Sequence, residues 1–284
     1  MVKLVDTADL KSAASLVAGV RVQFPSRAPV TFQSASPLSN QPTFNCTACG
    51  QCCHNLKLPL GIAEAVDWLH RGGQVQIICE AIPWVAEPDA ADAVASHKRS
   101  ISFAAMSGQL PIRVLVYLVA SFDGPCPQLG ANNMCGVYAH RPLTCRIYPA
   151  EVNPFVAIDP AQKACPPDAW QGVVPLMTDT LHADVRAFRQ RARDEVQHKA
   201  WLCAQLGIHW SAISNQGYAI HTPDPAQLLR ALLACPDTAA HPTHGSWALT
   251  THVAENIQTL QDMGALCAPA ATLADGVVQY VHFV

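Results

Sequence analysis

The stretch Cys46-Thr47-Ala48-Cys49-Gly50-Gln51-Cys52-Cys53 holds four cysteines within eight residues, a density that ordinary packing does not explain. Two cysteines separated by two residues and followed by a glycine can form a turn in which both thiolates converge on one metal ion. Gly50 suits this turn because glycine adopts a left-handed backbone conformation without steric cost. Adjacent side chains in extended backbone point in opposite directions, so we expect Cys52 and Cys53 to face two metals or two sides of one cluster. The alternative is that one of the two is a ligand and the other only packs.

Four more cysteines, on turn-rich sequence further along the chain, complete a set of eight. A hairpin across Asn132-Asn133 would bring Cys126 beside Cys135. Eight thiolates suffice for two four-coordinate sites, or for one iron–sulfur cluster with extra thiols. The predicted metal ligands are Cys46, Cys49, Cys52, Cys53, Cys126, Cys135, Cys145 and Cys165.

The chemistry of thiolate ligands limits the choice of metal but leaves more than one candidate. Soft thiolates select zinc, copper(I) or iron–sulfur clusters, and we predict an iron–sulfur cluster or zinc. The bacterial ferredoxin run C-x2-C-x2-C-x3-C-P is matched through Cys46, Cys49 and Cys52, but Cys53 departs from it. The spacing alone therefore leaves zinc and iron open.

Two arginines flank Cys145, and their positive charge would offset that of a thiolate cluster. Arg141 and Arg146 are therefore the candidate cofactor-binding residues, either for the cluster or for an anionic ligand. The alternative is that they are ordinary surface or helix-capping arginines. His54 is a weaker candidate that would replace one thiolate. The other cysteines are expected to pack as small apolar residues: Cys79, Cys203, Cys235 and Cys267.

The overall composition limits the kinds of partner. Of 284 residues, 50% are hydrophobic and 14% are charged, against about 25% charged in an average soluble domain. The net charge is −3, so the chain has no electrostatic reason to bind nucleic acid or an anionic membrane. We therefore predict a metal ion or cluster as the partner, no nucleic acid and no membrane, and leave a protein partner open.

Twelve cysteines would also suit an exported, disulfide-bonded protein, but the N-terminus lacks a signal peptide. Asp6, Asp9 and Lys11 interrupt its one candidate apolar run. The longest apolar run, Val114 to Phe122, is far shorter than the roughly 20 residues that span a bilayer. We therefore predict a cytoplasmic protein, in which clustered cysteines bind metal or do redox chemistry rather than form disulfides.

The chain divides into four parts. Residues 1–29 resemble a tRNA gene translated as though it were coding, which implies a non-native leader, and residues 30–44 are typical of a linker. Residues 45–170 are the predicted metal-binding domain, and residues 171–284 are a helical C-terminal segment. The expected fold class is α+β: a small cysteine-rich, metal-stabilised core with short strands and helices, followed by the mainly helical segment.

Individual elements follow from the hydrophobic pattern. The spacing of Ile62, Val66 and Leu69 predicts an amphipathic helix over 62–70. The β-branched residues over 112–120 predict a buried strand. Further helices are predicted over 179–205, 224–234 and 246–263.

Two motifs resemble those of a known family. They are Cys46-x-x-Cys49-Gly-x-Cys52-Cys53 and Cys135-x-Val-Tyr138-x-x-Arg141-Pro142-x-x-Cys145-Arg146-x-Tyr148-Pro149. Over residues 45–166 the chain resembles the YkgJ-type cysteine-cluster proteins, the CxxCxxCC family of zinc- or iron-chelating domains. The resemblance implies a bacterial protein that binds zinc or an iron–sulfur cluster through these cysteines. His140 stands where the family commonly has an acidic or other polar residue, so no role is implied for it.

The sequence thus predicts a metal-binding protein of unknown reaction, and whether it is an enzyme stays open. One alternative is a redox enzyme or a protein lysine N-methyltransferase, because the related flagellin lysine N-methylases share the cysteine pattern. The other is a structural zinc module for protein–protein contact. The chain has no Gly-x-Ser-x-Gly, Walker, Gly-x-Gly-x-x-Gly or His-Glu-x-x-His motif, so no catalytic residue is predicted.

Overall fold

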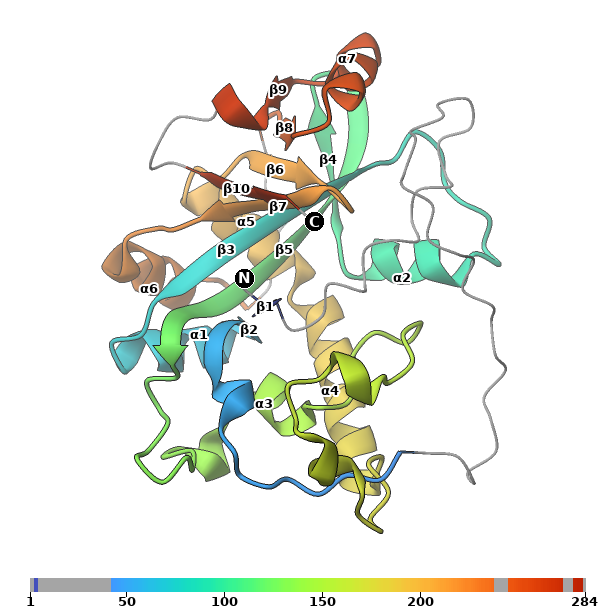
Figure 1. The fold of residues 1–284 in the computed structure, drawn as a ribbon. Helices are drawn as coiled ribbons and strands as arrows, with labels where there is room; N and C mark the ends of the chain where they lie inside the picture. The colour runs from blue at the N-terminus through green and yellow to red at the C-terminus, as the bar shows by residue number, and fades with distance from the viewer. Residues whose placement is uncertain (1–2, 5–41, 238–244, 273–277, 283–284) are drawn as a thin grey trace.

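The structure, a computed structural model, describes residues 3–4, 42–237, 245–272 and 278–282. Figure 1 shows a sheet with helices in the upper part and a lower part of loops and short helices packed beside α4. We call the lower part the cysteine lobe, residues 42–53 and 126–178. Nearly all of the predicted leader, and the predicted linker up to residue 41, lie outside the described residues.

The described part of the chain forms strands, α-helices and short 3-10 helices. The strands are β1 (Lys3–Leu4), β2 (His54–Leu60), β3 (Val75–Pro83), β4 (Phe103–Ser107), β5 (Leu110–Pro125), β6 (Trp210–Ile213), β7 (Gly217–His221), β8 (Ala248–Thr251), β9 (Cys267–Pro269) and β10 (Gln279–His282). The α-helices are α1 (Ile62–His70), α2 (Ala93–Ser100), α3 (Leu143–Ile147), α4 (Asp179–Asp194), α5 (Val196–Gln205), α6 (Pro225–Leu233) and α7 (Ala254–Asp262). The 3-10 helices are η4 (Gln51–Cys53), η5 (Tyr138–His140), η6 (Pro160–Gln162), η7 (Pro167–Trp170) and η8 (Ala270–Thr272).

The described strands form one ten-stranded mixed sheet around β3 and β5. These two strands pair antiparallel, with Val75 opposite Ala120 and Pro83 opposite Ile112. The order along the sheet is β1-β2-β5-β3-β6-β8-β9, while β7 pairs with β3 and β10, and β4 pairs with β5. All of β3 except its last residue is buried, as expected for a continuous apolar strand covered on both faces.

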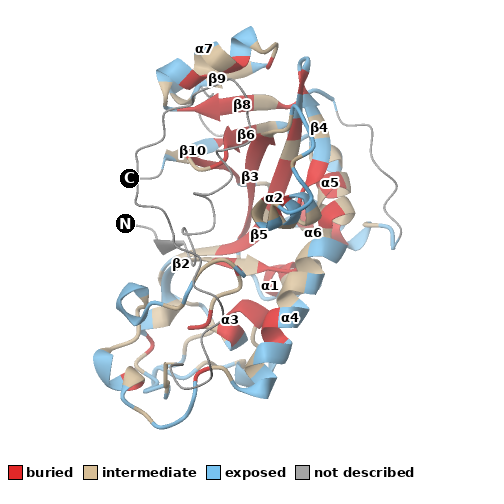
Figure 2. Cartoon of the chain, turned by 90° about the vertical axis from the view of Figure 1, so that its right-hand side faces the viewer, coloured by how far each residue is buried: buried red, intermediate tan, exposed pale blue. Residues whose placement is uncertain are grey.

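The two faces of the sheet carry cores of different size. On one face Ile77, Val114 and Leu118 belong to the main core, which also takes in buried residues of α1, α5 and α6. On the other face Ile78 and Tyr218 belong to a much smaller cluster. Figure 2 shows buried residues concentrated in the sheet and α3, whereas α4 and the loops of the cysteine lobe are mostly intermediate or exposed.

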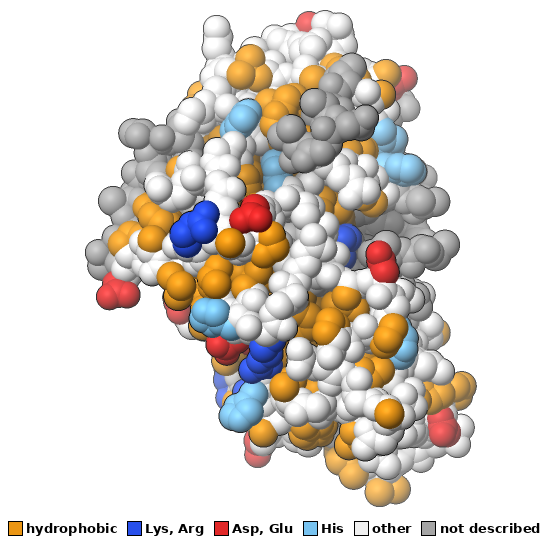
Figure 3. Space-filling view, turned by 90° about the vertical axis from the view of Figure 1, so that its left-hand side faces the viewer, with side chains coloured by type: hydrophobic (Ala, Val, Ile, Leu, Met, Phe, Trp, Pro, Cys, Tyr) orange, Lys and Arg blue, Asp and Glu red, His pale blue; other side chains and the backbone are white. Residues whose placement is uncertain are grey.

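Charged side chains are sparse on the outside as well. Figure 3 shows one face of the molecule on which few Lys, Arg, Asp or Glu side chains interrupt the neutral and hydrophobic surface. None of the helices in the described part of the chain has the length and apolarity of a membrane span.

The α+β class is confirmed, as are the helix over 62–70 and the strand over 112–120, which is part of β5. The predicted helix over 179–205 is two helices, α4 and α5, that meet at Glu195. The helix predicted over 246–263 is wrong for its first part, because residues 248–251 form β8. That strand is buried beside β6, so pairing within the sheet determines its conformation.

The C-terminal segment contains four of the helices and also strands β6 to β10, all of which join the central sheet. These strands have three to five residues each. A fully buried run this short, such as Gly217–His221, lacks the alternation that identifies a strand from sequence.

Candidate metal centre

The first cysteine turn is shaped by Gly50. This residue has φ +73° and begins η4, so it adopts the left-handed conformation expected of it. Its carbonyl oxygen accepts a hydrogen bond from the Cys53 amide at 2.9 Å and lies 3.0 Å from Nδ1 of His54. A Cβ atom on Gly50 would lie 3.3 Å from Cβ of Asn133, so the turn packs closely against the loop that carries Cys126 and Cys135.

The second cysteine loop continues directly from the sheet. The amide of Cys126 donates to the Cys53 carbonyl at 2.7 Å, which extends the pairing of β2 with β5 into the cysteine lobe. The chain then turns back at Asn133, which has φ +58°, and Leu129 pairs antiparallel with Cys135. The predicted hairpin is therefore present, and it fixes both cysteines beside the first turn.

Helix α3 carries Cys145 and is anchored at its N-terminus. The Leu143 amide donates to Oε1 of Glu64 at 2.7 Å, and Oγ1 of Thr144 donates to the Pro59 carbonyl at 2.8 Å. Glu64 lies in α1 and Pro59 in β2, so Cys145 is held against the sheet and the helices packed on its main core, α1, α5 and α6, which we call the sheet lobe.

Tyr148 positions the last cysteine of the set. Its hydroxyl accepts a hydrogen bond from the Ala164 amide at 2.8 Å and also hydrogen-bonds the Cys165 thiol. Lys163, two residues before Cys165, forms an ion pair with Glu151. We did not predict a role for Tyr148 or Lys163, although both stand close to predicted ligands in the sequence.

One subset of thiols gathers around Cys52. Its pKa is raised by a hydrogen bond with Cys53, then by burial, and then by the charges of Cys53, Cys165 and Cys46. Burial raises the pKa of Cys165, and the charges of Cys49 and Cys46 raise it as well. The four thiols that act on one another here are Cys46, Cys49, Cys52 and Cys165.

A second subset gathers around Cys145. Burial, followed by the charges of Cys53, Cys126 and Cys135, raises the pKa of Cys145 to about 12. Burial likewise raises the pKa of Cys126, and the charges of Cys53 and Cys135 add to it. Cys53 belongs to this subset as well, but its pKa is shifted in the opposite direction. The hydrogen bond with Cys52 lowers the pKa of Cys53 to about 6.

The two subsets meet where Cys52 and Cys53 adjoin, with their Sγ atoms 3.9 Å apart. In the described part of the chain, no three or more Cys, His, Asp or Glu side chains lie close enough to hold a metal ion as they stand. The donor set nevertheless fits zinc or iron, since all eight predicted ligands are free thiols gathered around the cysteine lobe. A hydrogen bond with Cys53 and burial raise the pKa of Cys52, burial raises that of Cys145, and the charges of neighbouring thiols add to both; a bound cation would stabilise these thiolates.

The two candidate arginines have different surroundings. The Arg141 guanidinium lies over the Tyr138 ring, 3.6 Å from its centroid, and its charge lowers the pKa of Cys53. Arg146 is exposed and forms an ion pair with Asp184 of α4. The structure therefore places Arg141 beside the thiols and pairs Arg146 with a helix of the protein.

The remaining cysteines lie away from the cysteine lobe. Cys79 and Cys203 are fully buried in the main core and hydrogen-bond each other. Cys267 packs against the same core, and Cys235 follows α6 with partial exposure. The twelve cysteines thus divide into eight in or beside one lobe and four elsewhere.

Comparison with known families finds a match, over a region that contains the eight predicted ligands and also Cys79. Residues 45–166 match the model of the CxxCxxCC family, described as "Putative zinc- or iron-chelating domain". No curated protein and no solved structure matches the chain. The matched residues run from just before Cys46 to just after Cys165, so they include all eight predicted ligands. Over residues 45–166, less than half of its length, the chain is therefore similar to the CxxCxxCC family of zinc- or iron-chelating domains.

Proposed function

We propose that the protein holds zinc or iron in two adjoining four-thiolate sites that meet at Cys52 and Cys53. The first site would use Cys46, Cys49, Cys52 and Cys165. The second would use Cys53, Cys126, Cys135 and Cys145. The observation that supports this division is that, apart from the contact between Cys52 and Cys53 where the sets meet, the charge interactions among the thiols join members of one set.

The local geometry favours two sites over one. Cys52 and Cys53 lie in a 3-10 turn, where successive side chains point about 120° apart. Four thiolates are the usual complement of a structural zinc site and of an iron–sulfur cluster alike. Bound metal would link four separate stretches of the cysteine lobe and thereby stabilise it.

A nearby arginine and a reducing compartment would both favour metal-bound thiolates. Arg141 would offset part of the negative charge of the second site, because its guanidinium already favours the Cys53 thiolate. We place the protein in the cytoplasm, where clustered thiols stay reduced and can bind metal.

The test is metal and acid-labile sulfide analysis of the full chain purified without oxygen. Cys46→Ser and Cys135→Ser each remove one ligand from a different proposed site. We expect each variant to lose about half of the metal, and the double variant to lose nearly all of it. Cys235→Ser is the matched control, because Cys235 is partly exposed outside the lobe, and it should keep the wild-type metal content.

The cofactor is read from the same samples. An absorbance near 400 nm that bleaches with dithionite, together with labile sulfide, would identify iron–sulfur, and stoichiometric zinc in a colourless protein would identify zinc. A folded wild-type protein without metal would overturn the proposal. Loss of all metal in either single variant would show one polynuclear site and overturn the division.

A further inference from the structure

Two exposed histidines, His252 and His282, lie side by side outside the cysteine lobe. His252 directly follows β8, and His282 is the last residue of β10. Their ring centroids are 5.3 Å apart, with an angle of 44° between the ring planes. Two imidazoles on one tetrahedral metal ion, each about 2.0–2.1 Å from it through a ring nitrogen, have centroids about 5 Å apart. The two rings therefore have the spacing of a two-histidine chelate.

Tyr280 fixes the orientation of the His252 ring. The Tyr280 hydroxyl donates its one proton to the Gln216 carbonyl at 3.1 Å. Its oxygen therefore accepts from Nδ1 of His252 at 2.8 Å, and also from the His252 amide at 3.4 Å. Because Nδ1 carries the proton, Nε2 of His252 has the lone pair that a metal ion needs. Histidines that bind a metal through one ring nitrogen usually donate a hydrogen bond from the other in this way.

The backbone that carries the two histidines is held by the sheet. Thr251, just before His252, is fully buried, and its hydroxyl donates to the side chain of Gln216. Tyr280 and His282 are two residues apart on β10, so their side chains leave the same face of the strand. A Cβ atom on Gly217 of β7 would lie 2.6 Å from the Tyr280 hydroxyl, so glycine is what leaves room for this ring. The rings are thus exposed to solvent on a well-anchored base.

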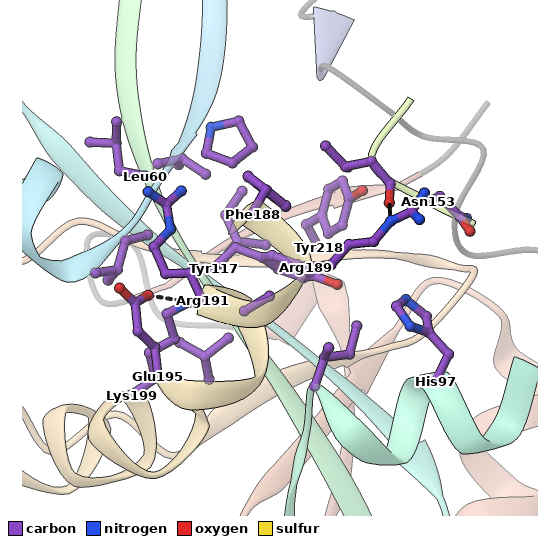
Figure 4. A pocket seen from close by; sticks show the side chains of 18 residues that line it. Leu60, His97, Tyr117, Asn153, Phe188, Arg189, Arg191, Glu195, Lys199 and Tyr218 are labelled. Carbon is purple, nitrogen blue, oxygen red and sulfur yellow. Dashed lines mark hydrogen bonds and ion pairs between the residues drawn. The ribbon is translucent and has the colours of Figure 1, made fainter. Parts of the chain in front are cut away.

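The surroundings of His97 are different and do not suit a cation. Figure 4 shows His97 in the pocket between α4 and the sheet, at the end that Arg189 reaches. Burial, followed by the charges of Lys98, Arg189 and Arg193, lowers the pKa of His97 to about 4. Three positive side chains around one half-buried ring would repel a metal ion.

We propose that His252, through Nε2, and His282 together bind a divalent transition metal ion of the kind that imidazole prefers, such as zinc, nickel or copper. Water or an external ligand would fill the remaining coordination positions. The site lies outside residues 45–166 and shares no residue with the proposed thiolate sites, so either proposal can fail without the other.

The test uses nickel–nitrilotriacetate as the probe, with the full metal-loaded chain. The chelator leaves adjacent coordination positions of nickel open for a pair of imidazoles, and it limits exchange of nickel with the thiolates. We expect calorimetry to show one saturable site per chain, and His252→Gln and His282→Gln should each weaken it at least tenfold. His70→Gln is the control, because His70 is exposed at the end of α1, and it should bind as the wild type does. Absence of saturable binding, or wild-type affinity in either of the first two variants, would overturn the proposal.

Chemical modification gives a second readout on the wild-type protein alone. Diethyl pyrocarbonate acylates accessible imidazole nitrogens, and mass spectrometry of peptides locates the modified residues. Nickel–nitrilotriacetate should slow the modification of His252 and His282 at least tenfold and leave that of His70 unchanged. Equal rates with and without the probe, or equal protection of all three histidines, would contradict the proposal. This measurement needs no substitution, so it decides the question even if a variant does not fold.

Discussion

At the scale of single residues, the pair Cys52–Cys53 determines how the eight thiols can be divided between two metal sites. The sequence predicts that these neighbours face different metals because extended backbone alternates its side chains. The structure instead has them in a 3-10 turn, with the extended backbone beginning at His54. The separation of the two thiols into different subsets therefore follows from the turn that Gly50 begins, and Gly50 is the residue whose change should disturb it most directly.

We expect Gly50→Ala to reduce metal content as well as stability. A side chain at φ +73° costs about 1–2 kcal/mol, and the new Cβ would also press on Asn133 at 3.3 Å. Gly72→Ala is a matched control, because Gly72 has φ +76° and no atom within 4 Å of an added Cβ. Both variants should lose similar stability from backbone strain, and only Gly50→Ala should lose metal. Chemical denaturation and metal analysis check this, and equal metal content in the two variants would contradict it.

At the scale of elements, Glu64 joins three helices. Its Oε2 accepts from the Gly61 amide at 2.8 Å at the start of α1, and its Oε1 accepts from the Leu143 amide of α3. Arg191 of α4 completes the junction at 2.7 Å, with both charged side chains largely buried. The helix that carries Cys145 is thus fixed to the sheet lobe through one carboxylate.

Glu64→Gln should destabilise the protein by about 2 kcal/mol, because it leaves a largely buried arginine without its charged partner. Glu87→Gln is the control, since Glu87 pairs with Arg99 where both side chains are 58% exposed. An exposed pair contributes little, and that variant should lose less than about 0.5 kcal/mol. Urea denaturation of both variants measures the difference. A loss in Glu64→Gln as small as in Glu87→Gln would show that the junction does not hold α3 in place.

The elements also show which parts of the fold could be predicted. In residues 62–70 the apolar side chains recur with the period of a helix, and this face of α1 is buried in the main core. Residues 112–120 have the β-branched composition of a strand and form part of β5. The strand goes on to Pro125 through polar residues because β2 pairs with it there. Strands β6 to β9 could not be recognised, since each is too short to show a period and depends on a partner strand distant in sequence.

At the scale of the whole molecule, the sequence identifies the thiols that gather in the cysteine lobe but not how they are arranged there. Cysteine spacing identifies the eight thiols because few other functions need them at such density. Their division into two sets depends on long-range contacts, such as those that place Cys165 near Cys46. The Tyr148 hydroxyl accepts a hydrogen bond from the Ala164 amide, sixteen positions along the chain, and no local sequence pattern predicts such a contact.

The main core of the sheet and the apolar cluster of the cysteine lobe differ in size, and this predicts what metal removal should do. The main core takes in most of the sheet and several helices, whereas the cluster between α3 and α4 has four buried residues, Leu143, Ile147 and Ala150 of the cysteine lobe and Val185 of α4. So small a core stabilises a lobe weakly, and metal–thiolate bonds would supply the remainder. Removal of the metal should therefore loosen the cysteine lobe while the sheet stays folded.

Hydrogen exchange before and after metal removal measures this directly. Peptides covering residues 45–53 and 126–142 should lose protection when a chelator removes the metal. Peptides covering 75–83 and 112–120, in the centre of the sheet, should keep it, because their hydrogen bonds join β3 to β5 within the main core. Uniform loss of protection would mean that the metal supports the whole molecule. Unchanged exchange throughout would mean that the cysteine lobe is stable without metal. The first result would contradict the independence of the two cores, and the second would contradict the dependence of the lobe on metal.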